Sequence, residues 1–92
     1  MLNSLYGKLN SLKPFKLEIS NESEFHKGHL GYSNGNTHFK ITIVSDHFIN
    51  LSKIARHRLI YQLLSEELKT QIHALSITAL SINEYSSFQN NT

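Results

Sequence analysis

Histidine is the residue type most able to do chemistry in this chain, with six copies among 92 residues and no cysteine. His26 and His29 lie three residues apart in a glycine-containing segment that also carries Glu22 and Glu24. A neutral imidazole is a common metal ligand, and a loop lets such a ring reach a metal held elsewhere. The spacing therefore suggests a metal-binding loop, and the alternative is a polar loop whose histidines are incidental.

His73 stands where a predicted turn becomes a predicted strand, and a structural role is its alternative. If the first strand ends near the start of the last strand, His73 and either His26 or His29 jointly offer two imidazoles. Two imidazoles without a thiolate form an incomplete site for a soft metal. A partner protein would therefore have to complete the site.

The other three histidines are expected to be structural or solvated. His57 falls on the apolar arc of a predicted helix, which favours a buried or half-buried ring with a local hydrogen bond. His38 lies on a predicted strand, on the face opposite Phe39 and Ile41, where a surface or inter-element hydrogen bond is expected. His47 falls in a predicted turn and is expected to be solvated.

Several kinds of chemistry are excluded or disfavoured by what the chain lacks. Without cysteine there is no disulfide framework, no thiol nucleophile and no thiolate ligand from this chain. There is no nucleophile elbow and no glycine-rich phosphate loop after a strand. The Gly28-His29-Leu30-Gly31 string matches the GXXG of KH domains, but it lies between two predicted strands and is read as coincidence. We expect neither enzymatic activity nor a small-molecule substrate.

Length and charge set further limits. Ninety-two residues predict one domain, with an ordered core over about 2–85 and a polar tail over 86–92. The formal net charge of +2 is too weak to indicate nucleic-acid binding by itself. No apolar run approaches a membrane span, and the N-terminus lacks the apolar core of a signal peptide. A cytoplasmic protein with no membrane partner is therefore expected.

The first half of the chain predicts a helix and two strands. Leucines at spacings of three and four predict an amphipathic helix over residues 1–12, which Pro14 ends. Clean alternation predicts a strand over 15–20, with Phe15 facing the core together with Leu17 and Ile19. Residues 21–36 form a loop longer than a hairpin needs. A second strand follows over 37–45.

The second half predicts one long helix and one strand. Ser52 is a plausible N-cap for a helix over about 53–69, and a bend or break near its middle stays open. Its apolar arc is broad and includes Ile54 and Tyr61. The third strand is predicted over about 74–82, followed by a short turn and a frayed tail. The order helix-strand-strand-helix-strand indicates an α+β domain, with helices covering one face of a three-stranded sheet.

The sequence resembles the BolA family over roughly residues 15–85. The matching motifs occur in order along the chain, and they are Asn21-Glu22-Ser23, Thr37-His38-Phe39-Lys40, Val44-Ser45-Asp46, Arg56-His57-Arg58-Leu59-Ile60-Tyr61, Glu66-Glu67-Leu68 and Ile72-His73-Ala74-Leu75-Ser76-Ile77. The resemblance implies a BolA-like fold related to the type II KH arrangement. This agrees with the predicted order of elements.

The resemblance also implies a partner and a cofactor. BolA-like proteins pair with monothiol glutaredoxins and share a bridging 2Fe–2S cluster, for which the glutaredoxin supplies its active-site cysteine and a bound glutathione thiol. The BolA-like partner supplies a histidine at the position of His73, and often a second ligand from the loop. Counting from Asn21 places that ligand on His26, with His29 in reserve. No cluster is expected in the isolated protein. Such complexes serve iron sensing, cluster trafficking or maturation.

A second function follows from the same resemblance, because bacterial members are described as transcriptional regulators linked to stress and cell shape. Lys53, Arg56 and Arg58 would then be candidates for DNA contact. The sequence departs from many relatives at one position, where Asn50 replaces a glycine before Leu51-Ser52. Asparagine tolerates the left-handed backbone conformation better than most residues, so the turn is expected to survive.

Overall fold

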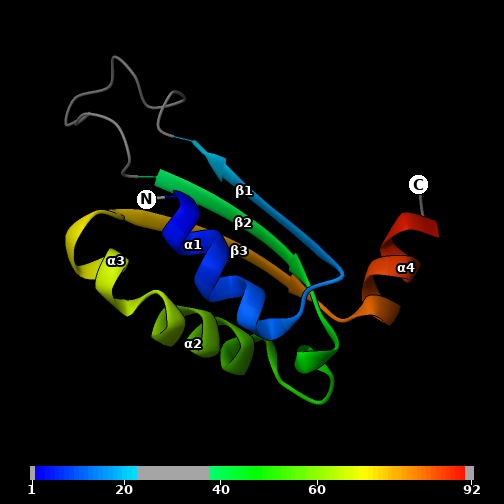
Figure 1. Ribbon diagram of the computed structural model, residues 1–92. Helices are drawn as coiled ribbons and strands as arrows, with labels where there is room; N and C mark the ends of the chain where they lie inside the picture. The colour runs from blue at the N-terminus through cyan, green and yellow to red at the C-terminus, as the bar shows by residue number, and fades with distance from the viewer. Residues whose placement is uncertain (1, 23–37, 91–92) are drawn as a thin grey trace.

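The computed structural model describes residues 2–22 and 38–90, and the structural statements below refer to these residues. Figure 1 shows the arrangement. In chain order the elements are α1 (Leu2–Leu9), η1 (Asn10–Leu12), β1 (Lys16–Asn21), β2 (His38–Val44), η3 (Asp46–Phe48), α2 (Lys53–Leu63), α3 (Ser65–Thr70), β3 (Ala74–Leu80) and α4 (Ile82–Asn90). The predicted order helix-strand-strand-helix-strand is confirmed, and one further helix follows it.

The sheet has three strands in the order β1-β2-β3. β1 pairs antiparallel with β2, and Leu17 lies opposite Ile43. β2 pairs parallel with β3, and Ile41 lies opposite Ile77. Two parallel neighbours need a crossover, which α2 and α3 supply. The amino ends of β2 and β3 therefore lie at one end of the sheet, which is also the end where β1 finishes (Figure 1).

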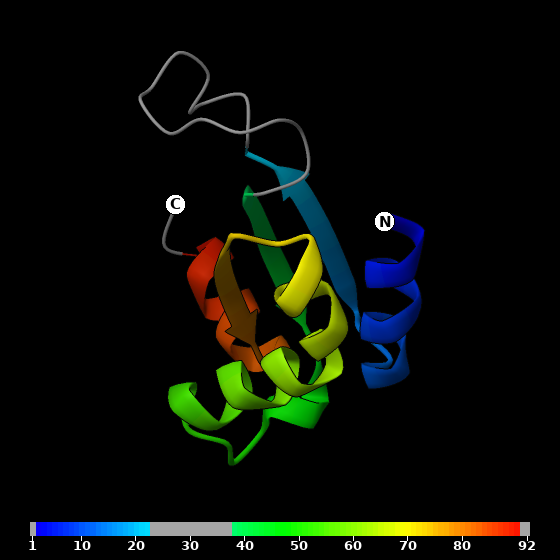
Figure 2. The ribbon, with the colours of Figure 1, turned by 90° about the vertical axis from the view of Figure 1, so that its left-hand side faces the viewer.

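The core lies between the sheet and the helices α1, α2 and α3. Phe39, Ile41 and Ile43 on β2 are buried, as the alternation of that strand predicted. The buried side chains of this cluster come from both halves of the chain, and they are Leu5, Leu9, Leu12, Phe39, Ile41, Ile43, Phe48, Ile60, Leu64, Ile72 and Ala79. Figure 2 shows α1 and α2 around the same sheet from a second direction.

Three apolar residues predicted to face the core are exposed instead. Phe15 is 65% exposed because it precedes β1, and its ring lies 6.2 Å from that of Tyr85. Ile54 is 65% and Tyr61 45% exposed on α2. The predicted apolar arc of this helix is wider than the surface that the sheet covers, so its edges stay in solvent.

The predicted helix over 53–69 is two helices, because Leu64 leaves helical geometry with φ −104° and ψ 20°. The sequence allows this break but does not predict it. The N-cap prediction is confirmed, since the Ser52 Oγ accepts a hydrogen bond from the N–H of Ala55 at 3.0 Å. Asn50 has φ 68°, so it adopts the left-handed conformation expected of it in place of glycine.

Helix α4 corrects the sequence prediction of a turn and a frayed tail after the third strand. Ser81 and Glu84 cap it reciprocally. The N–H of Glu84 donates to Ser81 Oγ at 3.3 Å, and the N–H of Ser81 donates to the Glu84 carboxylate at 2.7 Å. This is a capping box, which satisfies two backbone donors at the start of a helix.

The position of α4 adds to the predicted layers. Lys16 donates from its amine to the Tyr85 hydroxyl at 3.1 Å, and its amine lies 5.2 Å from the centre of that ring. Side chains alternate along a strand, so Lys16 points away from the face that Leu17 shares with the core. α4 therefore contacts the second face of the sheet. No helix within residues 2–22 and 38–90 combines the length and apolarity needed to cross a membrane.

Candidate metal centre

His73 is exposed and lies directly before β3. The backbone that leads to it is well anchored. The carbonyl of Glu67 accepts hydrogen bonds from the N–H groups of Gln71 and Ile72, each at 2.8 Å, and Ile72 is buried in the core. The exposed imidazole of His73 therefore projects from an anchored segment of backbone.

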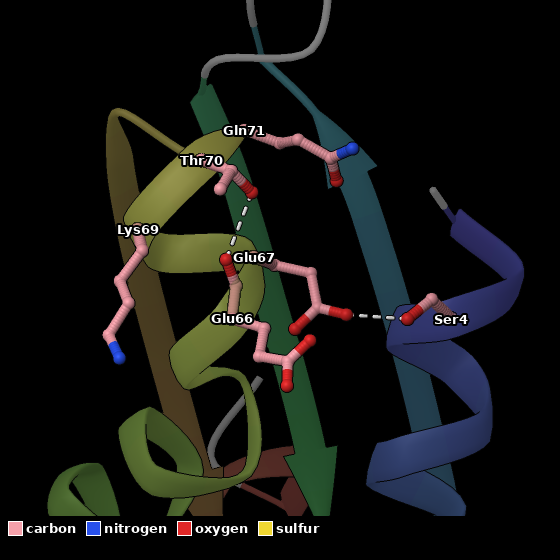
Figure 3. A pocket seen from close by; sticks show the side chains of 6 residues that line it. All are labelled: Ser4, Glu66, Glu67, Lys69, Thr70 and Gln71. Carbon is pink, nitrogen blue, oxygen red and sulfur yellow. Dashed lines mark hydrogen bonds between the residues drawn. The ribbon is translucent and has the colours of Figure 1, made fainter.

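The side chain of Glu67 fastens this segment to the N-terminal helix. Its carboxylate accepts hydrogen bonds from Ser4 Oγ at 2.5 Å and from the Lys8 amine at 2.9 Å. Figure 3 shows Glu67 reaching from α3 towards Ser4 on α1. Burial by itself would raise the pKa of Glu67, but the hydrogen bonds from Ser4 and Lys8 outweigh it and hold the pKa below its ordinary value. The ionised carboxylate therefore links α3 to α1 just before His73.

Of the described histidines, His38 is the one whose ring lies against the ring of His73. Their ring centres lie 5.5 Å apart, with the ring planes inclined by 50°. His38 is the first residue of β2 and pairs in register with Ala74, the first residue of β3. The parallel pairing of two strand starts therefore brings the two imidazoles together.

Glu22 and His38 are the described residues on either side of residues 23–37, and their backbones contact each other. The N–H of Glu22, which follows β1, donates to the carbonyl of His38 at 2.7 Å. The expectation that the first strand ends near the start of the third is therefore confirmed, with β2 between them. His26 and His29 lie outside the described residues, so their part in the site stays a prediction. The GXXG string over residues 28–31 lies outside them as well.

The donor set decides what this site can hold. Among residues 2–22 and 38–90, no three metal-ligating side chains gather in one place. The described part of the site is a pair of imidazoles, His38 and His73, next to a shallow groove whose lining includes Glu22 and Lys40. Imidazole nitrogen is an established ligand of the iron in 2Fe–2S clusters of the Rieske type. The residues fit a site in which sulfur ligands come from another molecule.

The other described histidines, His47 and His57, lie on η3 and α2 rather than at the starts of β2 and β3. His57 is half-buried on α2, as its place on the apolar arc predicted. His47 is exposed in η3, and its Nδ1 lies 3.4 Å from the hydroxyl of Ser45.

The candidate DNA contacts divide into two groups. Lys53 and Arg58 are exposed on α2. Arg56 is only 9% exposed, and its guanidinium donates to the carbonyl of Ala79 at 2.9 Å and to the Glu84 carboxylate at 2.6 Å. Its guanidinium is therefore already hydrogen-bonded within the protein, and DNA contact by Arg56 stays a prediction.

Three buried or paired groups were missed from the sequence. The sequence predicts a surface or inter-element hydrogen bond for His38 and does not predict its contact with the His73 ring. It also does not predict that Arg56 and Glu67 connect elements inside the protein. The order β2, α2, β3 is the signal that could have located His38, since a crossover of this kind places two parallel strands side by side. Both histidines would then start neighbouring strands.

The fold and site define a class of small α+β modules. This chain has a three-stranded mixed sheet, a helical crossover between the parallel strands, and an exposed histidine directly before the last strand. The family model described as BolA-like protein matches residues 9–84. This chain belongs to the BolA-like protein family.

Three relatives show how far the similarity extends. The chain is 48% identical over 73 residues to SufE-like protein 1 of Arabidopsis thaliana, covering 74% of this chain and 20% of that protein. It is 40% identical over 76 residues to the DNA-binding transcriptional regulator BolA of Vibrio cholerae, covering 83% and 69%. The structure of BolA1 from Arabidopsis thaliana superposes with a TM-score of 0.80 and 38% identity, covering 89% of this chain and 92% of that one.

The lengths of these relatives differ. The chain spans one fifth of SufE-like protein 1 and 48% of the chloroplastic BOLA1 protein of Arabidopsis thaliana, but 69% of the Vibrio regulator. The similarity therefore describes the BolA-like domain. The Vibrio relative is named as a regulator and not as an enzyme.

Proposed function

We propose that this protein is an adaptor that binds a monothiol glutaredoxin and supplies a histidine ligand to a bridging 2Fe–2S cluster. The observation that carries the proposal is the position of His73, which is exposed and follows an anchored backbone. A ligand to a metal centre on another protein has to be both accessible and fixed in place. His73 meets both conditions.

The composition supports a division of ligands between two proteins. The chain has no cysteine, so every thiolate of the cluster has to come from elsewhere. In this proposal the glutaredoxin cysteine and a bound glutathione supply the thiolates, and His73 supplies an imidazole. His26 supplies the second, with His29 in reserve. When bound, the cluster contributes the iron and sulfide, and this chain contributes the nitrogen ligands and their placement.

The proposal also includes a cellular process and a compartment for the protein. It acts in iron–sulfur trafficking or iron sensing, it is not an enzyme, and the cytoplasm stays its predicted compartment. Plant relatives with chloroplastic or mitochondrial names mean that the compartment has to be measured for this protein.

Regulation of transcription is the second candidate function, in which the protein binds DNA and responds to stress or controls cell shape. The name of the Vibrio relative favours it. Lys53 and Arg58 offer two exposed cations on α2. The formal charge of +2 gives this reading little support.

Titration of the protein into a cluster-loaded monothiol glutaredoxin tests the first candidate through visible circular dichroism. We expect a new spectrum with the wild type, its loss with His73→Ala, and an altered spectrum with His26→Ala. His47→Ala is the matched control, because His47 is exposed but lies in η3. If wild type forms no complex and leaves the spectrum unchanged, the adaptor proposal is wrong.

A parallel binding assay tests the second candidate. A phosphate interface releases counterions, so DNA affinity that belongs to it falls steeply between about 50 mM and 200 mM salt. We expect such a fall only if regulation is a real function, together with weaker binding by Lys53→Ala and Arg58→Ala. Absence of measurable DNA binding at low salt would remove this candidate.

A further inference from the structure

A pair of imidazoles, those of His38 and His73, lies at the amino ends of β2 and β3. We infer that His38 and His73 together bind one divalent transition-metal ion, such as Zn²⁺ or Ni²⁺, on this chain without glutaredoxin. The inference does not depend on the proposed cluster. It assigns a ligand role to His38, which the sequence pattern had assigned to a surface hydrogen bond.

The separation of the two rings carries the inference. A histidine nitrogen binds zinc at about 2.0–2.1 Å, so the ion lies roughly 3 Å from the centre of the ring. Two rings on one tetrahedral ion therefore have centres roughly 5 Å apart. The observed separation of His38 and His73 is 5.5 Å, and their planes are inclined rather than stacked.

The placement of the two residues supports the geometry. His38 starts β2 and His73 directly precedes β3, and the register of Phe39 with Leu75 fixes the two strand starts against each other. Phe39 is buried in the core, so the backbone beneath His38 is held. The imidazoles are therefore partly preorganised, which lowers the entropic cost of holding an ion.

The chemistry of the donors selects the metal. Imidazole suits zinc, copper and nickel, while calcium and magnesium prefer oxygen ligands. Only two protein ligands are present among the described residues, so water completes the coordination. Such a site binds more weakly than a structural zinc site with four protein ligands.

Isothermal titration of the tag-free 92-residue chain with ZnCl₂ tests the inference. We expect one ion per chain, and an affinity at least tenfold lower for His38→Ala and for His73→Ala. His47→Ala should bind as the wild type does, since His47 is exposed in η3. Titration with MgCl₂ should give no saturable binding.

Two further measurements keep the test decisive if a variant folds poorly. His38→Gln retains a polar side chain at the start of β2. We expect this variant to lose affinity for Zn²⁺ and to keep the far-ultraviolet circular dichroism spectrum of the wild type. In wild type, NMR signals of the ring nitrogens of His38 and His73 should both shift on adding Zn²⁺. Wild-type affinity in His38→Gln, or a shift at His73 without one at His38, would overturn the inference. If His26→Ala is the only variant that lowers the affinity for Zn²⁺, the inference is wrong and His26 is a zinc ligand instead.

Discussion

His38 is the first residue of β2 and His73 directly precedes β3, and the imidazole rings of these two residues lie 5.5 Å apart, centre to centre. The same end of the sheet is where β1 finishes, and His26 and His29 follow β1 in the sequence. The following predictions test whether that end serves chemistry or stability, and which contacts hold it.

The first prediction concerns the cost of removing His73. Exposed side chains away from special features usually change stability by less than about 0.5 kcal/mol on substitution. We expect His73→Ala to unfold in urea within that limit of the wild type while losing its effect on the glutaredoxin spectrum. His57→Ala, at a half-buried position on α2, should lose more stability. A large loss of stability in His73→Ala would indicate a structural histidine.

The second prediction concerns the pH dependence of the Glu67 contacts. The hydrogen bonds from Ser4 and Lys8 outweigh burial and lower the pKa of Glu67 in the folded state. A carboxyl group with a lowered folded pKa stabilises the protein above its unfolded pKa, and that contribution is lost as pH falls through the folded pKa. At pH 7 we expect Glu67→Gln to be less stable by about 1–2 kcal/mol.

The test is chemical unfolding of both proteins between pH 7 and the acid range. The difference between wild type and Glu67→Gln should shrink as pH falls below the ordinary carboxyl value of 4.5. Glu66→Gln is the matched control, because Glu66 is exposed on the same helix. A difference that stays constant with pH would mean that the ionised form of Glu67 contributes nothing.

The third prediction concerns Arg56, whose guanidinium connects three elements. It donates to the carbonyls of Leu51 and Ala79 and to the carboxylate of Glu84. A lysine amine cannot reproduce this forked geometry. We expect Arg56→Lys to lower the free energy of unfolding by about 2 kcal/mol, and Arg58→Lys, at an exposed site, to leave it unchanged. Equal effects of the two substitutions in urea unfolding would contradict the connection described here.

The fourth prediction concerns the cap of α4. Replacing an N-cap serine by alanine typically costs about 1 kcal/mol. We expect that loss in thermal unfolding of Ser81→Ala, whose hydroxyl accepts the N–H of Glu84. Ser87→Ala lies at an exposed position within α4 and should cost nothing, since alanine is the better helix former. If both variants melt at the wild-type temperature, α4 does not contribute to the cooperative unit.

Much of the fold was predictable because its signals are local. Alternation identified the buried face of β2 at Phe39 and Ile41, and residue type identified the cap at Ser52. The conformation of Asn50 also followed from its side chain, since asparagine is one of the few residues that adopt positive φ readily. The resemblance to the BolA family added the expectation for His73.

The rest depends on contacts between segments far apart in the chain. The burial of Arg56 requires hydrogen-bond acceptors from β3 and α4. The periodicity of the α2 sequence does not predict these acceptors. The proximity of His38 to His73 requires the strand order, which no single strand specifies. Helix α4 was missed for another reason, because the capping box of Ser81 and Glu84 was present in the sequence but its polar composition suggested a tail.

The most direct test of the central claim is pulsed electron paramagnetic resonance of the reduced cluster. The complex would be prepared from this chain carrying ¹⁵N-labelled histidine and from an unlabelled monothiol glutaredoxin with glutathione. A reduced 2Fe–2S cluster is paramagnetic, so a nitrogen bound to iron couples strongly to the electron spin. The account predicts strong ¹⁵N coupling in the complex, and loss of the His73 coupling in the His73→Ala complex or failure of that complex to form. A cluster-bearing complex without ¹⁵N coupling from this chain would contradict the account.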